Sequence, residues 1–191
     1  MVQTMMKRLF DVVFSIILFF VLGFPMLVIT IVIRLTSKGP AIHWSKRIGR
    51  DNRIFLMPKF RTMTVDTPQV ATHLLSGSQN YITPVGKFLR KTSLDELPQL
   101  MSVLVGDMSF VGPRPALFNQ DDLIQLRTQN GVEKIRPGVT GWAQVNGRDD
   151  LPIPVKVQFD KEYLERMNFV FDLKILFLTV FRVIAAEGVH H

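Results

Sequence analysis

The feature that most constrains this chain is a long apolar run near its N-terminus. Residues Leu9–Ile33, LFDVVFSIILFFVLGFPMLVITIVI, contain a single charged side chain, Asp11. About 20 apolar residues are enough for a helix to cross a bilayer, so this segment has to meet a membrane or be removed. A signal peptide has a shorter apolar core, of about 7 to 15 residues, and a small-residue cleavage site. No such site is apparent, and we expect a membrane-embedded helix.

Pro25 lies near the middle of this run. Proline removes a backbone donor and clashes with the preceding turn, so it kinks or breaks a helix. Basic residues flank the run on both sides, which the positive-inside rule accommodates best if both ends face the cytoplasm. These flanking residues are Lys7, Arg8, Arg34 and Lys38. Two alternatives stay open on these residues alone: a re-entrant helix that turns back at Pro25, and a spanning helix with a proline kink.

The charge balance points to an anionic neighbour. The 191 residues include 23 Lys and Arg against 16 Asp and Glu, a formal charge of +7. Nucleic acid, anionic lipid and a phosphorylated substrate all fit this charge. The sequence has no recognised nucleic-acid-binding pattern, so we do not expect a nucleic-acid partner. With no cysteine there is neither a disulfide framework nor a thiolate metal site.

The remaining sequence predicts a mixed α/β fold with short strands. Residues 43–63 read as a β-hairpin around the turn-like GRDN, and residues 136–148 as short strands and turns. Helical spacing predicts helices over 94–105, 118–128 and 155–167, and an amphipathic helix over 169–186 that lies at the membrane interface or closes the core. We expect residues 1–40 to be the membrane-embedded part and residues 41–189 to form one globular unit.

Asp95 and Glu96, in SLDELPQL, form a neighbouring pair of acids at a predicted helix start. Ser93 and Glu96 have the spacing of a capping box, which gives the acids a purely structural interpretation. Carboxylates also serve as nucleophiles, general bases or Mg²⁺ ligands. The four histidines have no ligand spacing, and the familiar glycine-rich phosphate loops are missing from the sequence. Zinc chemistry, a Ser-His-Asp triad and such nucleotide cradles are therefore not expected.

Five motifs in order resemble one family. KRLFD, KFRTM, RKTSLDELPQL, GDMSFVGPRP and RPGVTGWAQVNGR are similar to those of the bacterial sugar transferases, the monotopic polyprenyl-phosphate phosphoglycosyl transferases. The resemblance runs from about Lys7 to about Arg182, and the length matches the small members that consist of the catalytic domain alone.

The resemblance implies a fold, a location and a reaction. It implies a re-entrant helix broken at Pro25, on the cytoplasmic face of the bacterial inner membrane. It also implies transfer of a sugar-1-phosphate from a UDP-sugar, which we expect to be an N-acetylated hexosamine, to undecaprenyl phosphate. The reaction would need Mg²⁺, release UMP and initiate glycoconjugate assembly. Many small members have Ser-Pro where this chain has Phe24 before Pro25. Self-association is left open.

The resemblance also assigns site residues. Asp95 matches the nucleophile, which would form an aspartyl phosphosugar. Glu96 matches its paired acid, which would assist the metal or deprotonate the incoming phosphate, and both acids would bind Mg²⁺. Asp160 is either a further site residue or a structural one. The candidates for contacts with phosphate or nucleotide are Lys59, Arg61, Arg90, Arg114, Arg136 and Arg148.

One alternative needs no chemistry. A nonenzymatic protein could use the same basic surface simply to bind anionic lipid at the membrane. This alternative predicts that Asp95→Asn leaves function intact, whereas the enzymatic interpretation predicts that it does not.

Overall fold

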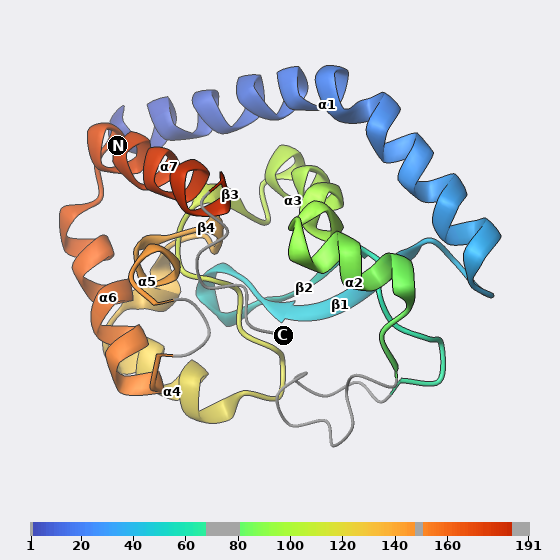
Figure 1. Cartoon of the computed structure of the whole chain (residues 1–191). Coiled ribbons are helices and arrows are strands. Elements are labelled where there is room, and N and C mark those ends of the chain that lie inside the picture. Colours follow the sequence, from blue (N-terminus) through green and yellow to red (C-terminus); the bar gives the residue numbers. More distant parts are fainter. Residues whose placement is uncertain (1, 68–80, 148–150, 185–191) are drawn as a thin grey trace.

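The computed structural model describes residues 2–67, 81–147 and 151–184. It has a mixed α/β fold, as predicted, in which a long helix, α1 (Val2–Thr36), arches over one side of a globular body (Figure 1). The other elements are β1 (Ile42–Ile48), η1 (Arg50–Asn52), β2 (Ile54–Phe60), α2 (Pro84–Lys91), η4 (Leu94–Gln99), α3 (Leu100–Val105), β3 (Ser109–Val111), α4 (Asp121–Gln129), η5 (Val132–Lys134), β4 (Gly138–Thr140), α5 (Trp142–Val145), α6 (Ile153–Arg166) and α7 (Phe169–Ile184).

Strands β1 and β2 form the predicted hairpin. They pair antiparallel with Ile42 opposite Phe60 and Ile48 opposite Ile54. At the tip, Asp51 and Asn52 have φ values of 55° and 57°. Asp and Asn tolerate this left-handed region better than most residues, which explains why RDN can close the turn.

Strands β3 and β4 form a short parallel pair in which backbones pass unusually close. Ser109 lies opposite Gly138, and Val111 opposite Thr140. A Cβ atom on Gly112 would lie 2.4 Å from the Arg136 carbonyl oxygen, and one on Gly138 would lie 2.1 Å from the Gly112 nitrogen. Only glycine fits at either position. The prediction of a strand within 136–148 is confirmed by β4. The second half of this segment forms the short helix α5 instead.

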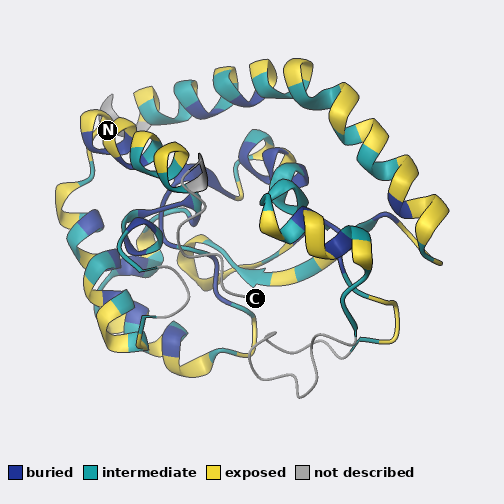
Figure 2. Ribbon diagram, viewed as in Figure 1, coloured by how far each residue is buried: buried dark blue, intermediate teal, exposed yellow. Residues whose placement is uncertain are grey.

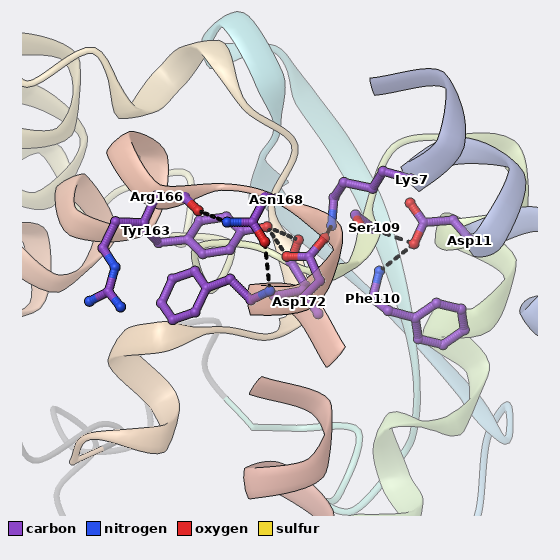
Figure 3. Close-up of polar contacts among 10 residues, drawn as sticks. Lys7, Asp11, Ser109, Phe110, Tyr163, Arg166, Asn168 and Asp172 are labelled. Atoms are coloured by element: carbon purple, nitrogen blue, oxygen red, sulfur yellow. Dashed lines mark hydrogen bonds and ion pairs between the residues drawn. The ribbon is translucent and has the colours of Figure 1, made fainter. Parts of the chain in front are cut away.

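The N-terminal end of α1 is tied to the globular body by polar contacts (Figure 3). Lys7 Nζ lies 2.6 Å from Asp172 Oδ2, and the Tyr163 hydroxyl donates to the other oxygen of that carboxylate at 2.7 Å. Asp11 accepts a hydrogen bond from the backbone N–H of Phe110 at 3.1 Å. Charged residues of KRLFD thus join α1 to α7 and β3.

The C-terminal end of α1 is tied to the same body. Arg61, which follows β2, donates from Nη2 to the Ser37 carbonyl at 3.0 Å and also binds the Lys38 carbonyl. Ile33 is buried in a cluster with Phe60 and Leu89. Both ends of α1 therefore contact one globular unit.

Pro25 does not interrupt α1. The helix is continuous from Val2 to Thr36 with Pro25 inside it, although its axis changes direction partway along (Figure 1). A proline lacks the N–H that would bond the preceding turn, which gives a physical reason for a bend there. The expected re-entrant path through a membrane stays a prediction.

The main core lies between α3, β3, α6 and α7. Its most enclosed apolar side chains are Val103, Met108, Val111, Tyr163 and Ile175. Phe10 and Phe14 of α1 pack on Phe110 at this core, with ring centroids 6.3 and 5.1 Å from it. The first half of α1 thus covers one side of this core.

Much of the length of α1 and α7 is exposed (Figure 2), and their exposed residues include large apolar ones. In α1, Phe20 is 85% exposed and Phe24 is 75% exposed. By length and composition, residues Met5–Thr36 could cross a membrane. Helix α7 buries Phe171 and Ile175 but leaves Phe177 exposed, which confirms its predicted amphipathic character.

Candidate active site

The acid pair lies in the first turn of η4, which continues directly into α3. The capping-box interpretation was wrong: Ser93 has a φ of 56°, and its side chain makes no capping bond. Glu96 is also unavailable as the second half of such a box, because its carboxylate is bound by two cations from other segments. Pro98 lies inside η4. The prediction that both acids stand at a helix start is confirmed.

Two cations hold the Glu96 carboxylate. Lys59 Nζ donates to Glu96 Oε1 at 2.9 Å, and Arg114 Nη2 donates to the same oxygen at 3.2 Å. The Glu96 side chain is only 20% exposed. Burial alone would raise its pKa, but Lys59 and Arg114 together hold the pKa well below the ordinary value. Glu96 is therefore ionised at neutral pH.

Asp95 lies in a different electrostatic environment. Burial is the main effect on it and raises the pKa of its carboxyl group, and the neighbouring negative charge of Glu96 acts in the same direction. Lys59 opposes this rise, and Arg90 and Arg114 oppose it more weakly. A partly desolvated carboxylate with a raised pKa is the more basic and more nucleophilic member of the pair.

Each cation comes from a separate element. Lys59 projects from β2 toward η4, and Arg90 comes from the last turn of α2. Arg90 is oriented by Thr62, whose hydroxyl accepts from its Nε at 3.0 Å, and by the Met63 sulfur, 3.1 Å from its Nη2. KFRTM therefore contributes both a cation at the acids and the residues that aim a second one.

The loop that carries Arg114 is fixed from two sides. Gly138 donates its N–H to the Pro113 carbonyl at 2.9 Å, which holds GPRP against β4. Arg127 of α4 donates from Nη1 to the Arg114 carbonyl at 2.8 Å. Arg127 is itself paired with Asp160 of α6, with its Nη2 2.7 Å from Asp160 Oδ2. Both side chains of this pair are buried.

Asp160 accordingly does not contact the acid pair. It holds Arg127, which holds the Arg114 backbone, while the Arg114 side chain reaches Glu96. This favours the structural alternative for Asp160, as a residue that positions the site. Sequence analysis missed Arg127, although its spacing of four from the buried Leu123 on α4 was a signal that it faces inward.

The other predicted cations lie elsewhere. The Arg61 guanidinium binds carbonyls after α1, and Arg136 Nε donates to the Gly106 carbonyl at 2.7 Å beyond the far end of α3. Their contacts give no support for a phosphate-binding role at the acid pair. Arg148 lies outside the described residues.

The donor set fits a magnesium ion that is shared with a substrate. Within residues 2–67, 81–147 and 151–184, no group of three or more acidic or histidine side chains could enclose a metal ion. Mg²⁺ is commonly held by one or two carboxylates together with substrate phosphates, and it keeps several waters. Asp95 and Glu96 supply two neighbouring carboxylates, which suits this shared type of site.

Comparison with known proteins gives a consistent result. The model of the family described as bacterial sugar transferase matches residues 2–186. The uncharacterized sugar transferase EpsL of Bacillus subtilis is 40% identical over 186 residues, which cover 96% of this chain and 90% of EpsL.

Two further relatives carry more specific names. The UDP-glucose:undecaprenyl-phosphate glucose-1-phosphate transferase of Escherichia coli is 39% identical over 95% of this chain. The undecaprenyl-phosphate galactose phosphotransferase of Salmonella typhimurium is 36% identical over 97% of this chain. The matched regions are only 40% and 42% of these two proteins' own lengths.

Proposed function

The chain belongs to the bacterial sugar transferase family, and we propose that it transfers a sugar-1-phosphate from a UDP-sugar to undecaprenyl phosphate at the cytoplasmic face of the membrane. The observation that carries this proposal is the half-buried acid pair, in which two cations bind Glu96 while Asp95 is left the more basic carboxylate. The names of the relatives support the substrates, since both named transferases use undecaprenyl phosphate.

The contacts of α1 support a re-entrant path. A straight helix of 35 residues is roughly 50 Å long, more than the roughly 30 Å of a bilayer's hydrocarbon core. A spanning helix would place its ends on opposite sides of the membrane. Here Lys7 and Ile33 both contact the same globular body, so both ends belong on one side. The basic residues at both ends favour the cytoplasmic side.

The outer surface supports the same placement. Beside α1 and α7, apolar side chains near the acid pair are exposed, with Phe88 of α2 at 60% and Met101 of α3 at 48%. Such side chains are stabilised in the boundary between headgroups and acyl chains. The acid pair, which lies between α2 and α3 in sequence, would then face the level of a polyprenyl phosphate headgroup.

In the first step, an oxygen of the Asp95 carboxylate attacks the phosphorus that bears the sugar. A new P–O bond forms to Asp95, the P–O bond to the uridine phosphate breaks, and UMP leaves with that electron pair. Lys59 and Arg114 bind the neighbouring Glu96 and also act electrostatically on Asp95, so they would stabilise charge on the transferring phosphoryl oxygens.

In the second step, a phosphate oxygen of undecaprenyl phosphate attacks the same phosphorus. The bond to Asp95 breaks and its carboxylate is regenerated. Glu96 adjoins the reacting carboxylate and stays ionised, because Lys59 and Arg114 hold its pKa low, so it would assist the metal, and the incoming phosphate would attack as its dianion. A bound Mg²⁺ would supply Lewis-acid stabilisation of the phosphate oxygens, with Asp95 and Glu96 as its protein ligands.

The test is UMP release by the purified chain with undecaprenyl phosphate and Mg²⁺. The panel contains UDP-glucose and UDP-galactose, which the names of the relatives suggest, and UDP-N-acetylhexosamines, which the sequence analysis favoured. At least one sugar should release UMP. Asp95→Asn should abolish that release, whereas Asp66→Asn, the same change at an exposed position, should retain it. Equal rates for the two variants would rule out the proposed nucleophile.

A further inference from the structure

A second basic site lies at the other end of α3 from the acid pair. It is a pocket of about 370 Å³ between the tip of the β1–β2 hairpin and the loop after α3. Arg50 and Arg53 line it from the tip, and Arg136 lines it from the segment before β4. Neither Asp95 nor Glu96 is among its lining residues in the part of the chain that the structure describes.

The cations at this pocket are crowded. Arg136 uses its Nε on the Gly106 carbonyl, and no ion pair to its guanidinium is found among the described residues. Burial lowers the pKa of Arg136, and the positive charges of Arg8 and Arg50 lower it further. Arg53 is exposed, and within the described residues its side chain likewise has no ion-pair partner. These guanidinium groups repel one another unless an anion lies between them.

The acids at the pocket compensate for only part of this charge. Asp51 and Asp107 line it, and Asp51 lies 3.5 Å from Arg50 at an exposed position. Three guanidinium groups thus face two carboxylates. A fourth guanidinium is adjacent, because a Cβ atom on Gly106 would lie 3.3 Å from Arg8 Nη2. Planar guanidinium forks match phosphate oxygens in geometry and charge.

The residues around the pocket indicate at which level of a membrane the pocket would lie. Arg8 immediately precedes the apolar run of α1 and donates to the Val103 and Leu104 carbonyls at 2.6 and 2.7 Å. Val105 follows them and is 68% exposed, while Ile54 on the pocket wall is 61% exposed. Headgroups occupy roughly 5 to 8 Å on each side of the hydrocarbon core. Exposed apolar residues next to a basic pocket suit this layer.

We propose that this pocket binds a phosphate ester group. An anionic phospholipid headgroup and a soluble nucleotide or phosphate both have this chemistry, and the apolar rim favours the lipid. The inference goes beyond sugar-phosphate transfer: it depends on the membrane placement of α1, and not on the chemistry at Asp95.

The experiment compares charge-matched variants of the full chain in detergent. Arg50→Gln/Arg53→Gln removes two pocket cations, and Lys134→Gln/Lys161→Gln removes two exposed cations elsewhere. Native mass spectrometry measures the binding of phosphatidylglycerol, phosphatidylcholine, UMP and inorganic phosphate. We expect wild type and the control to prefer phosphatidylglycerol over phosphatidylcholine. In the pocket variant, phosphatidylglycerol affinity should fall roughly 25-fold, about fivefold for each arginine.

The four ligands distinguish a lipid headgroup site from a site for a soluble phosphate. Loss of UMP or inorganic phosphate binding in the pocket variant, with phosphatidylglycerol binding unchanged, would reassign the pocket to a soluble phosphate and overturn the lipid source. Equal affinities for every ligand in the pocket variant and its control would overturn the site altogether. Arg53→Gln alone, which removes no ion pair seen in the described residues, should show the fivefold loss without affecting folding. Asp95→Asn should bind phosphatidylglycerol normally, so a failed transfer reaction and a failed lipid site are distinguishable.

Discussion

The buried pair of Asp160 and Arg127 should support the active site from a distance, and Asp160→Asn tests this. The Asp160 and Arg127 side chains are 1% and 9% exposed, and Arg127 Nε and Nη2 both donate to Asp160 Oδ2, at 2.9 and 2.7 Å. Burial raises the pKa of Asp160, so its ionised form is costly to bury. Asparagine removes that cost but leaves the Arg127 charge buried without a counterion.

The second effect should dominate, because arginine cannot shed its proton. Breaking a buried ion pair by removing one partner costs about 3 to 5 kcal/mol. The Asn side-chain oxygen can still accept one hydrogen bond, so we take the lower end, about 3 kcal/mol. For a chain of this size that lowers Tm by roughly 6 to 12 °C. Because Arg127 also holds the Arg114 carbonyl, kcat should fall more than KM changes.

Thermal unfolding in detergent and steady-state UMP release measure the two effects. Glu165→Gln is the matched control, since it makes the same carboxylate-to-amide change at an exposed position of the same helix. If the free energies of unfolding of Asp160→Asn and this control differed by less than about 0.5 kcal/mol, the size expected of a plain surface substitution, the reasoning would be refuted. A lower Tm with unchanged kcat would refute only the link to Arg114.

Three further predictions concern a cation at the acid pair, a close backbone contact beside β3, and the arginine that binds the carbonyls after α1. Lys59→Met removes the strongest influence that lowers the pKa of Asp95, so this pKa should rise. Because the nucleophile must be ionised, the acid limb of the kcat–pH profile should move to higher pH. The limb should not move in the control Lys87→Met, which makes the same change at an exposed position. Gly112→Ala should prevent folding or sharply lower Tm, because its Cβ would lie 2.4 Å from a backbone oxygen, whereas Gly23→Ala, with nothing within 4 Å, should keep the wild-type Tm. Arg61→Gln should lower stability by about 1.5 to 3 kcal/mol through lost charged hydrogen bonds, with kcat/KM per folded molecule within about twofold of wild type; a large loss of kcat/KM at unchanged Tm would instead return Arg61 to the active site.

The local elements of this fold could be predicted because their signals lie in short windows. The hairpin of β1 and β2 followed from β-prone residues around a turn, and α6 and α7 followed from helical spacing. The capping box at Ser93 failed for a nonlocal reason: Lys59 and Arg114 bind the Glu96 carboxylate, and neither is a sequence neighbour. Spacing rules do not include such competitors.

The sorting of the basic residues also needed the fold. Motif membership made Lys59, Arg61 and Arg136 equal candidates for phosphate contacts. Of these three, only Lys59 contacts the acid pair. The pair of Asp160 and Arg127 joins residues 33 positions apart. It depends on α4 and α6 lying side by side, which no short pattern encodes.

The central claim is that Asp95 carries the sugar phosphate during the reaction, and intact-mass measurement tests it most directly. The purified chain is incubated with Mg²⁺ and an active UDP-sugar but without undecaprenyl phosphate. We predict a mass increase of one sugar phosphate that maps to Asp95, accompanied by UMP release of up to one equivalent and reversed when undecaprenyl phosphate is added. Asp95→Asn should show neither adduct nor release, while Asp66→Asn should show both. An adduct on another residue, or full turnover by Asp95→Asn, would contradict the account.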